Sequence, residues 1–351
     1  MPALSVLDLV PVRSGQTTGE ALRASRSLAQ VADTLGYRRY WVAEHHNTES
    51  VAATNPPVLI AMLAGATERI KVGSGGVMLP NHAPLVIAEQ FALLEAAYPG
   101  RIDLGIGRAP GTDPLTRHVL RGQSAESADE AVARFPEYVD DIAMLMSPGG
   151  VEMSYGQRRQ PLRATPHAVS LPTMWLLGSS DYAARLAASR GLPYVFAHHF
   201  AGQGTAEALE LYRSSYQPSP EHPEPRTFLT ANVSVAATRE EAMRLARPHA
   251  LAMLSLHTGG PLLAVRSVEE AAEVALPAQH AEIVDTMLQR WIVDAPGEAQ
   301  ARIAGLAEEF GVDEVMVHPV AGAPADAPAD RTPGREETLR LLVGGAVVST
   351  P

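Results

Sequence analysis

The chain has 351 residues, of which 46% are hydrophobic and 19% charged, a composition that can build a large buried core. Its formal net charge of −11 argues against a nucleic-acid-binding protein, because such binding needs clustered Lys and Arg. The absence of cysteine excludes disulfides, thiolate catalysis and Cys-ligated metal sites. No uninterrupted apolar run approaches the roughly 18 residues of a membrane helix, so we expect a soluble, cytoplasmic protein with no membrane partner.

Short apolar segments alternate with longer segments of helical spacing from residue 4 onward. The segments that predict strands are 4–10, 38–43, 70–73, 101–106, 173–177, 193–197, 229–236 and 313–318. Helices are expected at 19–36, 56–66, 83–97, 126–146, 180–190, 203–215, 239–254 and 297–310. This alternation is typical of a parallel α/β sheet, and about eight such units close a barrel. We therefore predict one (βα)8 TIM-barrel domain over residues 1–318 rather than two Rossmann halves.

Three segments do not fit this alternation. Residues 147–172 combine Pro, Gly and mixed polarity without a clear period, and residues 255–292 add helix-like sequence before the last unit. Both are predicted to be insertions in the barrel. The Pro/Ala-rich stretch 319–334 predicts a mobile linker that leads to a C-terminal helix and tail over 335–351.

Unusual residues follow several of the predicted strands. In a parallel barrel the loops after the carboxyl ends of the strands open onto one face, which carries the chemistry. The residues in question are Glu44-His45-His46, Ser74-Gly75-Gly76, Gly107-Arg108, Gly178-Ser179-Ser180 and His198-His199. We expect them to share a single site.

The paired histidines limit what that site can be. Adjacent residues on extended backbone point to opposite sides, so one of His45 and His46, and one of His198 and His199, can face a common ligand. Zinc sites usually place two histidines on one face, through other spacings. A catalytic metal is therefore disfavoured, whereas acid–base chemistry and a simple polar loop end both remain open for Glu44-His45-His46.

The glycine and arginine motifs suggest a ligand with a phosphate. Gly75-Gly76 permits close approach of a ligand, or only a tight turn. The stretch at 105–111, GIGRAPG, is not the dinucleotide fingerprint, because its third glycine comes one residue late and Pro110 stands where the helix should begin. Arg108 suits a phosphate or carboxylate, or else a salt bridge to a neighbouring strand.

Two serines precede the predicted helix at 180–190. Free N–H groups at a helix start favour an anion, although a serine there can also be an ordinary N-cap. For Ser179 and Ser180, which follow Gly178 late in the barrel, a phosphate site is favoured. The side chains that could line a substrate pocket nearby are Met78, Phe196, His199 and Phe200.

Three long blocks, at 38–47 (RRYWVAEHHN), 70–113 and 175–200, resemble the bacterial luciferase-like flavin monooxygenases, particularly the alkanal-monooxygenase-like subgroup. The resemblance covers nearly the whole chain. It implies a TIM barrel that takes reduced FMN from a separate flavin reductase, and molecular oxygen that adds at the flavin C4a to give a peroxide. It also implies a homodimer.

The same resemblance implies roles for individual residues. His45 matches the active-site histidine, with Glu44 and His46 beside it, and we hypothesise that Glu44 fixes the tautomer of His45. The cofactor-binding positions that it implies are Gly75, Gly76, Arg108, Gly178, Ser179, Ser180 and His198. Gly75-Gly76 matches a pair whose non-proline cis peptide abuts the flavin ring, and Arg108 matches the arginine that binds the phosphate. His198 stands where the family has an aromatic residue.

The leading hypothesis is thus an FMN- and O2-dependent monooxygenase acting on an apolar or aromatic small organic molecule. The Ala- and Arg-rich composition is associated with high-GC coding sequences, and from it we expect a role in secondary metabolism such as antibiotic biosynthesis. An F420-dependent hydride-transfer enzyme of the same superfamily, a flavin-binding protein without turnover and a metal-dependent barrel hydrolase are the alternatives.

Overall fold

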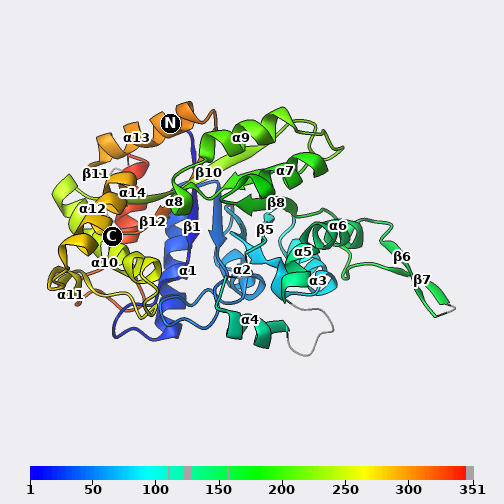
Figure 1. The fold of residues 1–351 in the computed structure, drawn as a ribbon, viewed down its shortest axis with the longest axis horizontal. Coiled ribbons are helices and arrows are strands. Elements are labelled where there is room, and N and C mark those ends of the chain that lie inside the picture. The colour runs from blue at the N-terminus through cyan, green and yellow to red at the C-terminus, as the bar shows by residue number, and fades with distance from the viewer. Residues whose placement is uncertain (110, 122–127, 157, 345–351) are drawn as a thin grey trace.

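The strands pair in parallel and close on themselves in the computed structural model, which describes residues 1–109, 111–121, 128–156 and 158–344. The barrel strands are β1 (Ala3–Asp8), β2 (Arg39–Val42), β3 (Lys71–Ser74), β5 (Ile102–Gly107), β8 (Thr173–Gly178), β9 (Tyr194–Phe196), β10 (Thr227–Val235) and β12 (Glu314–Pro319). They pair in this order, and β12 returns to β1 (Figure 1). The prediction of a (βα)8 TIM barrel is confirmed.

Helices surround the barrel and connect its strands. They are α1 (Thr18–Thr34), α2 (Pro56–Ala64), α3 (Pro84–Ala97), α4 (Pro114–Arg121), α5 (Ala128–Ala133), α6 (Phe135–Met146), α7 (Asp181–Arg190), α8 (His198–Ala201), α9 (Thr205–Ser214), α10 (Arg239–His257), α11 (Val268–Ala272), α12 (Ala278–Arg290), α13 (Pro296–Glu309) and α14 (Pro333–Leu342). The single helix expected at 126–146 is two helices, α5 and α6. Pro136 explains the break, because proline has no N–H and fits only the first turn of a helix. Residues 126 and 127 lie outside the described residues.

The barrel interior is filled with large side chains. Strand alternation turns Leu7, Trp41, Trp175, Phe228 and Met316 inward, where they form one apolar cluster. The three aromatic rings lie 5.0 to 5.8 Å apart between centroids. The barrel is therefore no pore, and a ligand must bind above this layer.

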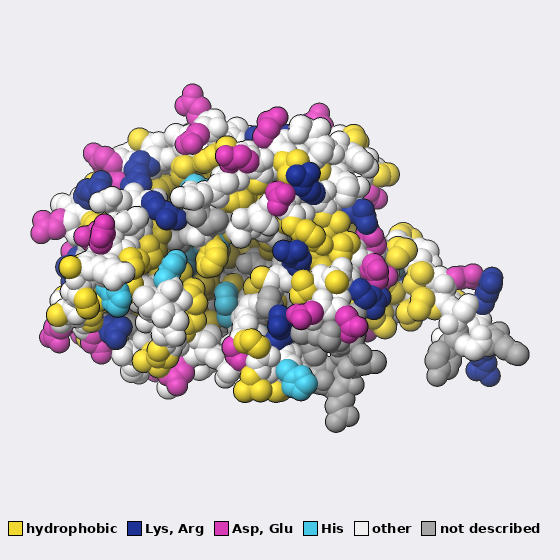
Figure 2. Space-filling view, viewed as in Figure 1, with side chains coloured by type: hydrophobic (Ala, Val, Ile, Leu, Met, Phe, Trp, Pro, Cys, Tyr) yellow, Lys and Arg dark blue, Asp and Glu magenta, His cyan; other side chains and the backbone are white. Residues whose placement is uncertain are grey.

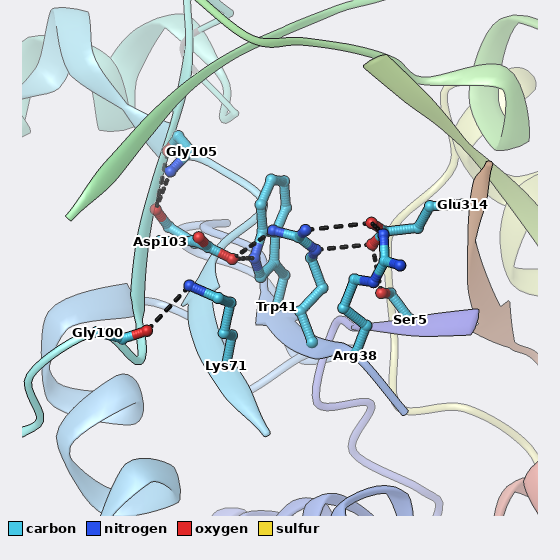
Figure 3. Close-up of polar contacts among 10 residues, drawn as sticks. Ser5, Arg38, Trp41, Lys71, Gly100, Asp103, Gly105 and Glu314 are labelled. Carbon is cyan, nitrogen blue, oxygen red and sulfur yellow. Dashed lines mark hydrogen bonds and ion pairs between the residues drawn. The ribbon is translucent and has the colours of Figure 1, made fainter. Parts of the chain in front are cut away.

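A buried charged group closes the other end of the barrel. The Arg39 guanidinium lies 2.7 Å from a carboxylate oxygen of Asp103 and 2.7 Å from one of Glu314, and Trp41 Nε1 also donates to Asp103 (Figure 3). All three charged side chains are almost fully buried. A charge can stay buried at such a position only when it is paired, so these residues fix the barrel and leave its carboxyl-end face free for chemistry.

The two predicted insertions take different forms. Residues 151–162 form an antiparallel hairpin of β6 (Val151–Tyr155) and β7 (Arg158–Leu162), which projects from the body (Figure 1). The sequence did not predict this hairpin. Gln157, between the two strands in the sequence, lies outside the described residues. The second insertion holds α11 and α12 and ends at β11 (Ile292–Asp294).

Residues 319–334, predicted to be a linker, connect β12 to α14 and pack against the body of the barrel. The backbone of this segment bonds to helices of the barrel, since Gly322 donates to the carbonyl of Leu245 and Val268 donates to the carbonyl of Ala323. It leads into α14, which packs against α1, α13 and β10 as an integral barrel helix. Small Pro and Ala side chains, which suggest flexibility in the sequence, here allow close packing. The tail at 345–351 lies outside the described residues.

The buried ion pair of Arg335 shows how firmly α14 is attached. Its Nη2 lies 2.6 Å from Oδ1 of Asp8, and its Nε donates to the carbonyl of Pro319. We expect Arg335→Ala to lower the free energy of unfolding by about 3–5 kcal/mol, because Asp8 would keep an uncompensated buried charge. The half-exposed Arg340, which pairs with Glu336 on the same helix, gives the control: Arg340→Ala should cost under about 1 kcal/mol in urea unfolding. Equal losses would contradict this role of Arg335.

The barrel wall is unusual between β9 and β12. The first part of β10 pairs with β9, through Thr227 to Leu229, whereas its last part pairs with β11, through Val233 to Val235. Helix α8 lies beside β10 where β9 has ended. Helix α8 and strand β11 therefore take the place of β9 beside the later part of β10. No helix in the described residues is long and apolar enough to span a membrane.

Candidate functional site

His45 lies inside the mouth of the barrel. It follows Arg39, Trp41 and Ala43 at the two-residue period of the inward-facing side chains of β2. Its Nδ1 is buried and has no hydrogen-bond partner among the described residues. This orphaned nitrogen is placed to exchange a hydrogen bond with a ligand.

Glu44 points to the opposite side, with His46. Nε2 of His46 and Nε2 of His82 donate to Oε1 of Glu44 at 2.9 and 2.8 Å, and the backbone N–H of Met78 donates to Oε2 at 3.0 Å. The expectation that Glu44 fixes the tautomer of His45 is therefore wrong. The prediction that adjacent histidines point to opposite sides is correct for His45 and His46.

The peptide between Gly75 and Gly76 is cis, as the resemblance implied. A Cβ on Gly76 would lie 2.3 Å from Cδ1 of Leu177 and 2.8 Å from the carbonyl oxygen of Gly105. A Cβ on Gly75 would meet Cδ1 of Leu7 at 2.9 Å. Both glycines are thus required by the close approach of neighbouring strands, and they leave bare backbone at the mouth.

Arg108 and the start of α7 come together at one edge of the mouth. The Arg108 guanidinium lies 3.9 Å from the ring centroid of Tyr182, in the first turn of α7. Ser180 is the N-cap of this helix, but its hydroxyl makes no capping bond. Among the described residues, no carboxylate pairs with Arg108. A cation, an uncommitted serine and free helix N–H groups therefore face the same region, with Ser179 and Gly178 just before them.

The histidines after β9 lie in the short helix α8, not on extended backbone as expected. Nδ1 of His198 hydrogen-bonds Oγ1 of Thr205 at 2.8 Å, and its ring packs on Phe310. These contacts belong to the helix layer, so the structure does not bring His198 to Arg108 or the glycine pair. His199 bonds to Thr230 of β10, an inward-facing position.

Of the expected pocket residues, His199 alone lines the cavity between α8, β10 and α13. Phe196 is fully buried in the core between barrel and helices, because Val195 takes the inward position of β9. Phe200 is 58% exposed on α8. Met78 lies beside Gly111 and is not among the residues that line this cavity. Neither Phe196 nor Phe200 lines this cavity.

The cavity, of about 350 Å³, lies beside the later part of β10, between α8, β11 and α13. It is lined by His198, His199, Gly202, Ala231, Asn232, Arg290, Trp291, Ile292, Arg302, Gly305, Leu306 and Glu309. Separately from this cavity, the face drawn in Figure 2 is hollowed near its centre, over the barrel strands, with histidine side chains beside the hollow. Apolar and charged groups both line the cavity, so it suits a small organic molecule with polar substituents.

Several residues of this region were missed from the sequence. His318 of β12 bonds through Nδ1 to Oδ1 of Asn232 at 2.8 Å, and its ring lies edge-on to the rings of His199 and His249 at 6.0 and 5.1 Å. Alternation in β12 gave a signal for His318, because it follows the inward-facing Glu314 and Met316 at the same period. Asn232 carries the same signal after Phe228 and Thr230 in β10, whereas for His82 and His249 the sequence carries no comparable signal.

The buried histidines are held neutral. Burial, with the neighbouring His198 and His45, lowers the pKa of His199 to about 4, and burial with Arg335 and His199 lowers that of His249 to about 3. Burial also lowers the pKa of His45, against the opposing effect of Glu44. Although burial alone would raise the pKa of Glu44, hydrogen bonds from His46 and His82 bring it to about 2. Glu44 is thus a fixed anion and no general acid.

We expect stability to fall below about pH 6.5. Unfolding frees His199 and His249 to bind protons at their ordinary pKa, so each stabilises the fold fully above that value and loses up to about 1.4 kcal/mol per pH unit below it. Glu44 adds its own loss only below about pH 4.5. The free energy of unfolding, measured with urea at pH values between 7 and 5, should fall less steeply with pH in His249→Gln than in the wild type. It should fall as in the wild type in His167→Leu, at an exposed histidine. A wild-type stability that is flat over this range would contradict the neutral cluster.

A (βα)8 barrel whose polar, partly orphaned side chains gather at the carboxyl ends of the strands has the architecture of a barrel enzyme. The family model of luciferase-like monooxygenases matches residues 3–314. The uncharacterized protein YvbT of Bacillus subtilis (strain 168) is 44% identical over 316 residues, 90% of each chain. The luciferase-like monooxygenase of Escherichia coli (strain K12) is 38% identical over 322 residues, 90% of this chain and 91% of its own. The crystal structure of apo-MsnO8 matches with a TM-score of 0.84 and 32% identity, over 98% of both chains. The chain belongs to the luciferase-like monooxygenase family.

More distant structures share the fold with different cofactors. A 3,6-diketocamphane monooxygenase constituent from Pseudomonas putida, in complex with FMN, has a TM-score of 0.66 at 19% identity. An F420-dependent secondary alcohol dehydrogenase, with an F420–acetone adduct, has the same TM-score at 15% identity. These likenesses concern the fold alone. In the described residues, no group of three or more His, Asp or Glu is arranged to hold a metal ion.

Proposed function

We propose that this protein is an FMN-dependent monooxygenase that uses O2 to oxidise a small organic molecule. The observation that supports this proposal most strongly is that three features meet at the barrel mouth. They are an arginine without a carboxylate partner among the described residues, an uncapped helix start and a bare glycine pair. These groups fit a flavin with a single phosphate. As further parts of the proposal, a separate flavin reductase supplies the reduced FMN, and the protein forms a homodimer.

The residues divide the work between binding and proton handling. Arg108, with the backbone N–H groups and hydroxyls of Ser179 and Ser180, would hold the phosphate. Gly75 and Gly76 would lie against the planar ring system, where no side chain intervenes. Reduced FMN supplies the electrons that activate oxygen. His45, neutral and without a protein partner at Nδ1, would hold or accept a proton beside the reacting atoms.

The phosphate site can be tested by comparing FMN with riboflavin, which lacks the phosphate. In fluorescence titrations we expect Arg108→Ala to weaken FMN binding by about tenfold or more, since a charge-assisted bond is worth roughly 1.5–3 kcal/mol. Riboflavin binding should stay nearly unchanged. The matched control is Arg185→Ala, which removes an exposed arginine from α7, the helix whose start would hold the phosphate.

Equal losses for both flavins would remove Arg108 from the phosphate site. The oxygen requirement is tested separately, by measuring oxygen uptake with photoreduced FMN and substrate. Reduction of a substrate with F420 in the absence of oxygen would contradict the proposed function.

A further inference from the structure

The hydrogen bonds of Asn232 determine the tautomer of His318. The Nδ2 amide of Asn232 donates to the carbonyl of His199 at 3.0 Å, which turns its Oδ1 towards Nδ1 of His318 at 2.8 Å. An amide oxygen only accepts hydrogen bonds. Nδ1 of His318 therefore carries the proton, and Nε2 of the neutral ring is a bare acceptor.

This acceptor lies inside the barrel and has no protein donor. His318 is 4% exposed, and in the described part of the chain no hydrogen bond to its Nε2 is recorded. Burial, with His249, His199, Arg335 and His45, holds the pKa of His318 well below its ordinary value. The ring therefore stays neutral, and its Nε2 is left free to accept a hydrogen bond from a ligand.

The surroundings restrict which ligand that can be. Burial, the main cause of the low pKa of both His318 and His249, equally disfavours a cationic donor beside them. The same burial disfavours an anion, because no free counter-charge adjoins His318 in the described residues. The cavity lined by Asn232, His199 and Trp291 has room for a ring system, and the Trp291 ring lies 5.3 Å from that of His249 between centroids. A neutral hydroxyl on an aromatic or enolic ring satisfies all three conditions.

We propose that the substrate is a hydroxyaromatic or enolic molecule whose neutral O–H donates to Nε2 of His318, and that Asn232 is the positioning residue that keeps this nitrogen unprotonated. The proposal rests on the monooxygenase function above and names its substrate class. It assigns the polar end of the substrate to β10 and β12, across the barrel mouth from Arg108.

Binding can be measured without turnover, using two probes of nearly equal size. These are 2-naphthol and 2-methylnaphthalene, in which a methyl group replaces the hydroxyl. In equilibrium titrations of the full chain at neutral pH, we expect the wild type to prefer 2-naphthol by about tenfold, the effect of one buried hydrogen bond. No preference, or no binding of 2-naphthol, would overturn the proposal.

The variants separate recognition from folding. His318→Leu should reduce the preference to about one, Asn232→Leu should reduce it severalfold, and Asn232→Asp, which keeps an acceptor for Nδ1–H, should retain it. His167→Leu, at an exposed histidine before β8, is the control. A preference that survives His318→Leu overturns the proposal.

The wild-type tautomer gives a test that needs no variant. Long-range ¹H–¹⁵N correlation spectra of the His318 ring should show the proton on Nδ1, and a proton on Nε2 would overturn the proposal. FMN titrations, run beside these measurements, test the monooxygenase function separately from the proposed hydroxyl-binding site. If FMN fails to bind while 2-naphthol is still preferred, the monooxygenase function fails and the hydroxyl site stands.

Discussion

Replacing His45 with alanine is expected to slow incorporation of oxygen into the organic substrate by about 10²–10⁴-fold, the usual contribution of a positioned acid–base group. His45 is the one of the two adjacent histidines that faces the barrel mouth, and its Nδ1 has no partner in the described residues. FMN binding should change little, because the phosphate residues lie on other strands. The measurement is the rate of ¹⁸O transfer from ¹⁸O2 to product, with released hydrogen peroxide assayed in parallel.

The hydrogen peroxide assay separates two explanations of a slow variant. If His45 handles the proton, His45→Ala should consume oxygen and release it as hydrogen peroxide instead of forming product. His257→Gln, at an exposed histidine near the end of α10, controls for general effects of removing an imidazole. Unchanged oxygen transfer and unchanged hydrogen peroxide release in His45→Ala would remove His45 from the chemistry.

The second large effect concerns folding, at Gly105 of β5. A Cβ there would lie 2.0 Å from the backbone carbonyl oxygen of Ser74, on the neighbouring strand β3. No side chain rotation relieves a clash with backbone, so Gly105→Ala should destabilise the protein by more than about 4 kcal/mol. Little folded protein should accumulate, as judged by soluble yield and urea unfolding.

Gly107, two residues further along β5, is the matched control. A Cβ at this position would meet the sulfur of Met78 at 3.6 Å, an ordinary contact. Gly107→Ala should therefore fold with a stability within about 1 kcal/mol of the wild type, the usual cost or gain of such a change. If both variants fold equally well, the strand contact at Gly105 is less tight than the structure indicates.

The barrel could be predicted because each strand carries a local hydrophobic signal that its neighbours repeat. The side of β2 that holds His45 was equally predictable, since alternation alone separates His45 from Glu44 and His46. Other features depend on contacts between distant residues. The partner of Glu44, His82, lies on a loop without periodicity, and Asn232 gains its role only from the fold that brings it beside His318.

The errors have a similar origin. Phe196 faces the helices because Val195 takes the inward position of β9, whereas His198 is redirected because β9 ends at Phe196 and α8 begins at His198. The Pro/Ala-rich segment at 319–334 has the composition of a linker, yet its small residues pack against helices that lie far away in the sequence. Composition reports local flexibility, whereas burial depends on the neighbours that the fold supplies.

The position of α8 beside β10 affects how this protein can change. Because β11 continues the sheet where β9 stops, the hydrogen bonds that close the barrel do not pass through α8. Residues 197–204 can therefore be altered in length or sequence without breaking the closed sheet, while they still border the cavity through His199 and Gly202. This short segment is the natural place to redirect the enzyme to new substrates, in the laboratory or in evolution.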